Sequence, residues 1–343
     1  MSAMSLSPCL LRVCAVSVLL GVVPGQEPAA GQDPRADYEK LAVELEVREL
    51  STLMFAKYDD ANLLKIEGFL QRHPDAPERE KVLYLRAYSL WSLHRYDDAP
   101  AAYAALLAEF PRTRFRRIAR IREAAAYLFS GQADKALPRL LALKNDHPDR
   151  PEVYARELAY ALSRCGQQDE AVEFMDSVEE QMIIEGKERL LSRIVSHFDK
   201  IRLVGKPLPV FTVEDHFTGE EINRETLRGK VALIDFWATW CGPCVAELPH
   251  ILAAHRALAP EGFVVFSVSL DEDQERMEKM IEDREMSWLH HFDGKKWQNE
   301  LAVAFDVHSI PASLLVDRKG VVRAVNLRGR EVADLVKGLL EDE

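Results

Sequence analysis

Cysteine is scarce in this chain of 343 residues, and its five cysteines are unevenly placed. Cys9 and Cys14 lie near the start, Cys165 stands alone, and only Cys241 and Cys244 lie close together. Small secreted domains that depend on disulfides for stability carry many cysteines for their length. A disulfide-stapled framework is therefore excluded, which leaves the one close pair available for chemistry. Cys165 is expected to be a small buried apolar side chain, with a resolving or regulatory thiol as the alternative.

Excess positive charge is also lacking. The chain has 44 lysines and arginines against 56 aspartates and glutamates, which gives a formal net charge of −12. A nucleic-acid-binding domain needs a basic surface, so we expect no nucleic-acid partner. The local exception is a set of arginines at helical spacing, which we interpret as a solvated helix face. These are Arg112, Arg114, Arg116, Arg117, Arg120 and Arg122.

A hydrophobic run long enough to cross a bilayer is missing as well. The uncharged run from Val13 to Val23 is shorter than the roughly 20 apolar residues that a spanning helix needs. Arg12 precedes it and Pro24-Gly25-Gln26 follows, an order typical of a secretory signal peptide. We therefore predict that residues 1–25 are a cleaved signal peptide and that the protein is exported to the bacterial periplasm. An uncleaved N-terminal membrane anchor is the alternative.

The first half of the mature chain is expected to be helical and repetitive. Residues 26–36 have the composition of a linker, and residues 37–200 show helical periodicity throughout. Pro74, Pro111 and Pro148 lie 37 residues apart, and each follows an apolar helix. Because proline cannot continue a helix, these prolines mark the ends of repeat units.

Small residues recur at fixed positions within these units. Such residues let antiparallel helices approach closely, and Gly131 and Gly166 are placed to end helices in left-handed turns. The pattern resembles degenerate tetratricopeptide repeats, followed by a capping helix at 181–200. Repeat stacks present concave surfaces, so we expect a protein or peptide partner here, with a packing or dimerisation domain as the alternative. The recurring residues are Ala87, Ala124 and Ala159, and Ala99, Ala136 and Ala171.

From residue 201 to residue 343 the pattern changes to alternating strands and helices. The continuous apolar runs 231–236 and 263–268 are typical of buried strands, and the runs 312–316 and 321–325 of a hairpin. This order predicts an α/β domain with a mixed central sheet. The expected helices cover 241–258, a segment from 273, 297–305 and 330–340.

The segment Cys241-Gly242-Pro243-Cys244 falls where a buried strand passes into a helix. The spacing of the two cysteines places both sulfurs on one side of the first helical turn, close enough to form a disulfide. Cys241 faces the unpaired N–H groups at the helix N-terminus, which favour a thiolate, so we predict a lowered pKa and the attacking role. Cys244 is predicted to be the more buried sulfur and to resolve the mixed disulfide.

The alternative for two cysteines at this spacing is half of a zinc site, which requires a second pair of ligands. His290, His291 and Asp293 are the candidates, but adjacent side chains on a strand point in opposite directions. We therefore predict redox chemistry without a metal or a cofactor. The two histidines are expected to be solvent-exposed.

Two carboxylates and a proline are candidate supports of this chemistry. Asp235 interrupts an apolar strand, so burial should raise its pKa and fit it to accept a proton from Cys244, directly or through water. A solvated position at the strand edge is the alternative. Glu247 is placed either to face the same sulfur or to lie on the helix surface. For Pro311 the spacing favours a trans bond, whereas a cis bond would turn the Ile310 backbone toward an extended substrate.

The segment Phe236-Trp237-Ala238-Thr239-Trp240-Cys241-Gly242-Pro243-Cys244 resembles the active-site segment of TlpA/ResA-type thioredoxin-like proteins. The resemblance extends over residues 203–343. It implies a thioredoxin-like fold in which Cys241 is the nucleophile, Cys244 the resolving thiol and Glu247 the active-site glutamate. It also implies that Trp240, Ile310 and a cis Pro311 contact the substrate. Two departures are Asp235, where the family usually carries Asn, and His308-Ser309 in place of a basic residue and Gly.

The Gly-Pro pair between the cysteines resembles reducing thioredoxins. The resemblance therefore implies reduction or isomerisation of disulfides in exported proteins, with electrons from a membrane thiol carrier, and cytochrome c maturation is one such pathway. The alternative is a helical-repeat scaffold whose thioredoxin-like domain has a secondary or redox-sensing role. A peroxiredoxin is disfavoured because Ala238 stands where that motif needs a hydroxyl.

Overall fold

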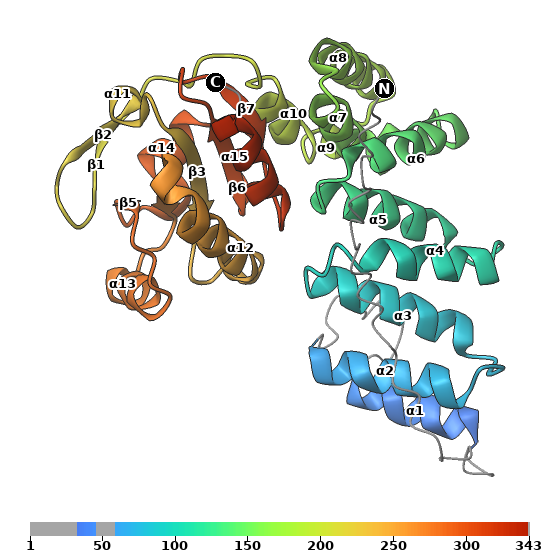
Figure 1. Cartoon of the computed structure of the whole chain (residues 1–343). Coiled ribbons are helices and arrows are strands. Elements are labelled where there is room, and N and C mark those ends of the chain that lie inside the picture. The colour runs from blue at the N-terminus through green and yellow to red at the C-terminus, as the bar shows by residue number, and fades with distance from the viewer. Residues whose placement is uncertain (1–32, 46–58, 342–343) are drawn as a thin grey trace, which may run out of the picture.

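The computed structural model describes residues 33–45 and 59–341, so the predicted signal peptide lies outside the described residues. A stack of helices is followed by a five-stranded mixed sheet that is flanked by helices (Figure 1). The predicted fold class, helical repeats before an α/β domain with a mixed sheet, is confirmed. None of the helices in the described part of the chain has the length and apolar character of a bilayer-spanning segment.

The helical domain stacks its helices side by side, as Figure 1 shows in blue and green. From α1 to α9 each helix contacts the next one in sequence, so the helices α2 to α8 each pack between two neighbours. The helices are α1 (Pro34–Glu44), α2 (Asp60–Arg72), α3 (Arg79–Ser92), α4 (Ala99–Glu109), α5 (Arg116–Phe129), α6 (Ala133–Asp146), α7 (Ala155–Arg164), α8 (Gln168–Ile184), α9 (Glu188–Leu191) and α10 (Val195–Ile201).

The repeating residues explain this packing. The six recurring alanines are all completely buried, because the helices cross there too closely for a larger side chain. Gly131 and Gly166 adopt φ of +74° and +75° after α5 and α7. The prediction of one capping helix over 181–200 is wrong. Gly186, at φ +67°, ends α8, and the chain continues as the single turn α9 and the short α10.

The sheet of the C-terminal domain has the strand order β5-β4-β3-β6-β7. Its central strand β3 (Val231–Trp237) runs parallel to β4 (Phe263–Ser269) and antiparallel to β6 (Ala312–Val316). The outer strands are β5 (Leu289–Phe292), parallel to β4, and β7 (Val322–Val325), antiparallel to β6. Every residue of β3 is buried, as its continuous apolar run predicts.

Helices cover both faces of this sheet. The long helix α12 (Gly242–Leu258) and α15 (Glu331–Glu341) pack on one face, against Val231, Leu233 and Leu315. The opposite face, which includes Phe236 and Phe266, packs against α14 (Glu300–Ala304) and belongs to one apolar cluster with side chains of the helical domain. The helix α13 (Gln274–Asp283) adds Met277 and Ile281 to the same cluster. The two domains therefore share one continuous core.

The C-terminal domain differs from expectation in three short segments. Its lead-in forms a small hairpin of β1 (Thr212–Glu214) and β2 (Glu221–Asn223), followed by α11 (Arg224–Leu227), and β5 was not expected. The prediction of one helix over 297–305 is wrong, because Asn299 interrupts it. The buried Asn299 side chain accepts hydrogen bonds from Leu301 and Ala302 and so begins α14 as a separate helix.

Candidate active site

Cys241 and Cys244 form a disulfide at the N-terminus of α12, with their Cα atoms 5.2 Å apart. Cys241 is the residue that caps this helix, and its sulfur accepts a hydrogen bond from the Cys244 N–H at 3.2 Å. Pro243 lies in the first turn, where a helix needs no N–H donor. The pair therefore sits at the positive end of a 17-residue helix, a position that stabilises negative charge on a capping sulfur.

Asp235 lies in the middle of β3, on the strand that leads to the cysteines. It is opposite Ser267 of β4 and Ser313 of β6, and it is buried, so the solvated position at a strand edge is excluded. Burial raises the pKa of Asp235 to about 7, while the positive charge of Arg328 opposes the rise and the negative charge of Glu247 adds to it. A carboxyl group that titrates near neutrality can both accept and release a proton under physiological conditions.

Glu247 lies one helical turn after Cys244 and is also buried, which excludes the helix-surface alternative. Its two carboxylate oxygens have different partners. One lies 3.0 Å from Nδ1 of His94 in the helical domain, and the other accepts the Gly329 N–H at 2.7 Å. Burial alone would raise the pKa of Glu247, but the His94 hydrogen bond, the charge of Arg328 and the Gly329 N–H together lower it.

The solvent-facing side of the site is aromatic and apolar. Trp240 is 41 % exposed and meets Trp297 edge to face, with ring centroids 5.9 Å apart. The Ile310–Pro311 peptide bond is cis, as the resemblance implied and against the expectation from spacing. The Arg328 guanidinium donates a hydrogen bond to the Pro311 carbonyl, so it links this loop to the carboxylates that it faces.

Sequence analysis did not identify His94, Arg328 or Gly329 as part of the site. His94 and Glu247 are 153 positions apart, and no local motif marks either partner of such a contact. Gly329 carried the one available signal, since a glycine after a strand often marks a close backbone approach.

Buried polar contacts hold the helical domain against the sheet. Arg164 of α7 pairs with Glu331 of α15 and donates to the Val325 carbonyl at 2.6 Å. Lys200 of α10 donates to the Asp306 carbonyl at 2.8 Å, close to the cis-proline loop in sequence. The relative position of the two domains is thus specified by directional bonds as well as by apolar contact.

The prediction that His290 and His291 are solvent-exposed is wrong, because both lie in β5 and are buried. His290 hydrogen-bonds the Met286 carbonyl at 2.9 Å, and His291 lies 3.2 Å from the Glu214 carbonyl. Burial lowers the pKa of His290 to about 4. In residues 33–45 and 59–341, no cluster of three His, Cys, Asp or Glu side chains is arranged to hold a metal ion.

The prediction of a buried Cys165 is also wrong. The residue is exposed because α7 ends there and Gly166 turns the chain away. It therefore does not serve as an apolar core residue.

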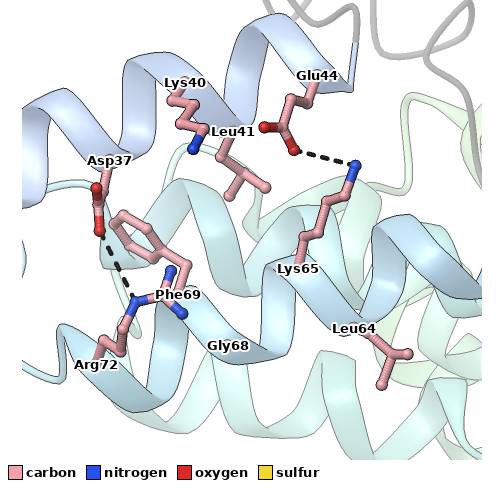
Figure 2. Close-up of a pocket in the computed structure, with 9 residues that line it drawn as sticks. All are labelled: Asp37, Lys40, Leu41, Glu44, Leu64, Lys65, Gly68, Phe69 and Arg72. Carbon is pink, nitrogen blue, oxygen red and sulfur yellow. Dashed lines mark ion pairs between the residues drawn. The ribbon is translucent and has the colours of Figure 1, made fainter.

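Hollows on the described part of the helical domain include one beside α5 and one between α1 and α2. One, of about 700 Å³, is lined by Arg114, Arg116, Arg117 and Arg120 together with Asp146 and His147, and the first three of these arginines are solvent-exposed, as expected of a solvated face. The other, of about 350 Å³, lies between α1 and α2 at the end of the stack away from the sheet (Figures 1 and 2). Its charged side chains pair across it, Lys65 with Glu44 at 3.0 Å and Arg72 with Asp37 at 3.8 Å (Figure 2).

In comparisons with known proteins, the helical domain and the C-terminal domain match different family models. The family model described as the AhpC/TSA family matches residues 204–325, and the one described as a bacterial transcriptional activator domain matches residues 63–187. The thiol:disulfide interchange protein DsbE of Pseudomonas fluorescens biotype C is 30% identical over 122 residues, which cover 36% of this chain and 65% of that protein. The thiol-disulfide oxidoreductase ResA of Bacillus cereus is 26% identical over 139 residues, which cover 40% of this chain and 77% of that protein.

A solved structure is also similar to part of this chain. The thioredoxin domain of thiol-disulfide oxidoreductase BVU-2223 from Bacteroides vulgatus is 28% identical, covers 40% of this chain and 98% of that chain, and has a TM-score of 0.37.

Proposed function

Because the C-terminal domain is a thioredoxin-like domain homologous to the ResA and DsbE thiol-disulfide oxidoreductases, we propose that this chain reduces or isomerises disulfides of exported proteins. The observation that carries the proposal is the Cys241–Cys244 disulfide at the N-terminus of α12, on the helix that follows the strand of the buried Asp235. This arrangement supplies a nucleophile, a resolving thiol and a proton acceptor.

The reaction begins with the reduced cysteine pair. The Cys241 thiolate attacks one sulfur of the substrate disulfide, forms a mixed disulfide and releases the first substrate thiolate. Cys244 then passes its proton to the Asp235 carboxylate and attacks the Cys241 sulfur, which releases the second substrate thiolate. The two cysteines lose two electrons and the substrate disulfide gains them. A membrane thiol carrier would return the electrons by the reverse exchange.

The surroundings of the cysteines suit an extended polypeptide as substrate. Trp240, whose ring is exposed, precedes Cys241 in sequence, and the ring of Trp297 packs against it and extends the aromatic surface. Ile310 and Pro311 precede β6 and would offer backbone to a strand-like segment. Aromatic side chains give contact area without requiring one particular sequence, which fits an enzyme that acts on several proteins.

The place of action and the division of labour belong to the same proposal. The predicted signal peptide at 1–25 supports export to the periplasm, and cytochrome c maturation is one pathway that needs such a reductant. The linker predicted over 26–36 leads into α1, which begins at Pro34. We assign the chain from there to residue 200 to the helical repeat domain predicted over 37–200, and residues 201–343 to the redox domain. The helical domain would recruit the protein partner, since repeat stacks present extended concave surfaces.

The test uses insulin as a disulfide substrate and dithiothreitol as the electron source. We expect the full chain to accelerate insulin precipitation and a Cys241→Ser variant to match the uncatalysed rate. Equal rates for the two proteins would overturn the proposal.

Substrates are identified with a Cys244→Ser variant, which cannot resolve the mixed disulfide and so retains them. We expect exported proteins to be released from this variant by dithiothreitol. The scaffold alternative instead predicts partners that are captured equally well by a Cys241→Ser, Cys244→Ser double variant.

A further inference from the structure

The connection between α3 and α4 carries a histidine from the helical domain to the redox site. His94 follows Leu93, the residue that caps the end of α3, and adopts φ of +58°, a conformation that non-glycine residues rarely adopt. Its Nδ1 lies 3.0 Å from the Glu247 carboxylate and 3.1 Å from the Tyr96 hydroxyl. The backbone of this turn is thus held in an uncommon conformation that directs the ring to a carboxylate of the other domain.

The other oxygen of the Glu247 carboxylate is approached closely by the backbone of Gly329. Gly329 donates its N–H to Glu247, and it also has a positive φ, of +58°. A Cβ added to Gly329 would lie 3.2 Å from the Phe129 carbonyl and 3.4 Å from the Tyr96 ring. The two domains therefore meet closely at Glu247, where the positive φ and the short Cβ distances both favour glycine, and both oxygens of Glu247 are engaged at this junction.

The donor in the His94–Glu247 contact follows from chemistry. An ionised carboxylate can only accept hydrogen bonds, so Nδ1 of His94 carries the hydrogen. The Gly329 N–H occupies the other oxygen. Glu247 is therefore held as an anion by one donor from each domain, beside the positive charge of Arg328.

We propose that His94 is a positioning residue of the redox centre, by which the docked helical domain keeps Glu247 anionic and so adjusts how readily Asp235 takes the proton of Cys244. The inference rests on the proposed dithiol chemistry. It assigns the helical domain a part in the reaction in addition to partner recruitment.

The charges around the two carboxylates support this coupling. His94 and the Gly329 N–H face Glu247, and Arg328 lies nearby. The charges of Glu247 and Arg328 both also act on Tyr96 and Asp235. Asp235 is acted on by burial, by Arg328 and by Glu247. Because the anionic Glu247 raises the pKa of Asp235, a Glu247 that gains a proton after losing its His94 donor would let the pKa of Asp235 fall.

The experiment follows the Cys244 step directly. The reduced full chain is mixed with saturating 5,5′-dithiobis(2-nitrobenzoate) in a stopped-flow instrument across pH 5–9. Cys241 and free thiols such as the exposed Cys165 react at rates set by reagent concentration, whereas the release that does not depend on reagent concentration reports attack by Cys244. For the wild type we expect this rate to rise with a midpoint near the pKa of Asp235, which is about 7.

Two substitutions separate the hydrogen bond from the backbone, since both glycine and asparagine accept a positive φ. We expect His94→Gly to move the midpoint to lower pH by about one unit, which is about tenfold in proton occupancy. His94→Asn keeps an N–H donor near the position of Nδ1 and should restore most of the wild-type profile. Asp97→Asn is the matched control, because it removes a neighbouring cross-domain ion pair to Arg330 without touching Glu247.

The outcomes are distinguishable. An unchanged midpoint in His94→Gly overturns the role of His94. Shifts in His94→Asn and Asp97→Asn as large as the shift in His94→Gly overturn it as well. A wild-type protein that reacts with the reagent but does not reduce insulin overturns the proposed function while leaving the His94 result valid. Circular dichroism of each variant before mixing verifies that the domain is folded.

Discussion

The two ends of the helical stack use the same kind of ion pair in different surroundings. Between α1 and α2, Lys65 and Glu44 lie 3.0 Å apart with side chains 46% and 35% exposed. Where the stack meets the sheet, Arg164 and Glu331 pair with side chains only 7% and 4% exposed. Water screens the first pair, whereas the second leaves an uncompensated charge in the core if one partner is lost. The comparison shows that the edge of the stack carrying Arg164 is fixed by its contact with the redox domain, whereas the edge at α1 and α2 is not.

The largest expected effect is the loss of the buried pair. Arg164→Ala leaves Glu331 without its cation and should lower the free energy of unfolding by about 3–5 kcal/mol. Urea unfolding followed by tryptophan fluorescence measures it. The Arg164→Ala, Glu331→Gln double variant, in which no buried charge is left unpaired, should recover part of the loss. A change below about 1 kcal/mol would place this pair with the exposed ones.

The second effect extends the comparison to a buried carboxylate that titrates. The pKa of Asp235 in the folded protein is about 7, above its ordinary value of 3.8, so the unfolded chain releases this proton at lower pH. Stability therefore falls as the pH rises from about 4 to about 7. Asp235→Asn removes this fall and should be more stable than the wild type at pH 8 by up to about 4 kcal/mol.

Urea unfolding of the oxidised proteins at pH 4 and pH 8 checks the Asp235 prediction. The stabilisation should disappear at the lower pH, and the same variant should slow the Cys244 step. A stabilisation that is equal at both values would show that ionisation of Asp235 is not its cause.

The third effect concerns the close approach at the domain junction. Gly329→Ala forces a side chain into a positive φ and toward the Phe129 carbonyl, and should destabilise the protein by about 2 kcal/mol or more. Gly320→Ala is the matched control, because Gly320 has φ of +80° but open space around its Cβ position. Equal losses of stability in the two variants would mean that backbone strain alone accounts for the effect.

The smallest effect is expected at the far end of the stack. Lys65→Ala should change the free energy of unfolding by less than about 1 kcal/mol, because the pair that it breaks is largely hydrated. Raising the salt concentration should reduce even this difference. A larger loss would mean that the hollow in Figure 2 contributes to stability in a way that its exposure does not suggest.

Sequence reasoning succeeded where the signal is local. The apolar run of β3, the change to helical periodicity at Cys241 and the spacing of the cysteines all lie within one short segment, and each predicts structure through period or capping. The prediction of close helix packing from the repeating alanines succeeded for the same reason, because their spacing is visible within each repeat. Asp235 could be identified because a carboxylate within a buried strand is conspicuous without knowledge of its neighbours.

Contacts between distant segments could not be predicted in this way. The burial of His290 and His291 depends on β5, whose four residues carry no strong strand signal, and on the segment around Glu214 that contacts it. His94 was missed because its function depends on how two domains meet, which neither local sequence contains. The part of the site that lies on one helix and one strand was therefore predictable, whereas its support from the helical domain was not.

The continuous core has a consequence for how this protein can be divided. Leu158, Ile194 and Phe198 of the helical domain belong to the same apolar cluster as Val322 and Val325 of the sheet. A redox domain expressed alone would present that apolar face to water, and exposed faces of this kind promote association. The junction between the domains is thus a poor place for a cut, and a change in substrate preference is better sought by altering side chains on the intact chain than by exchanging whole domains.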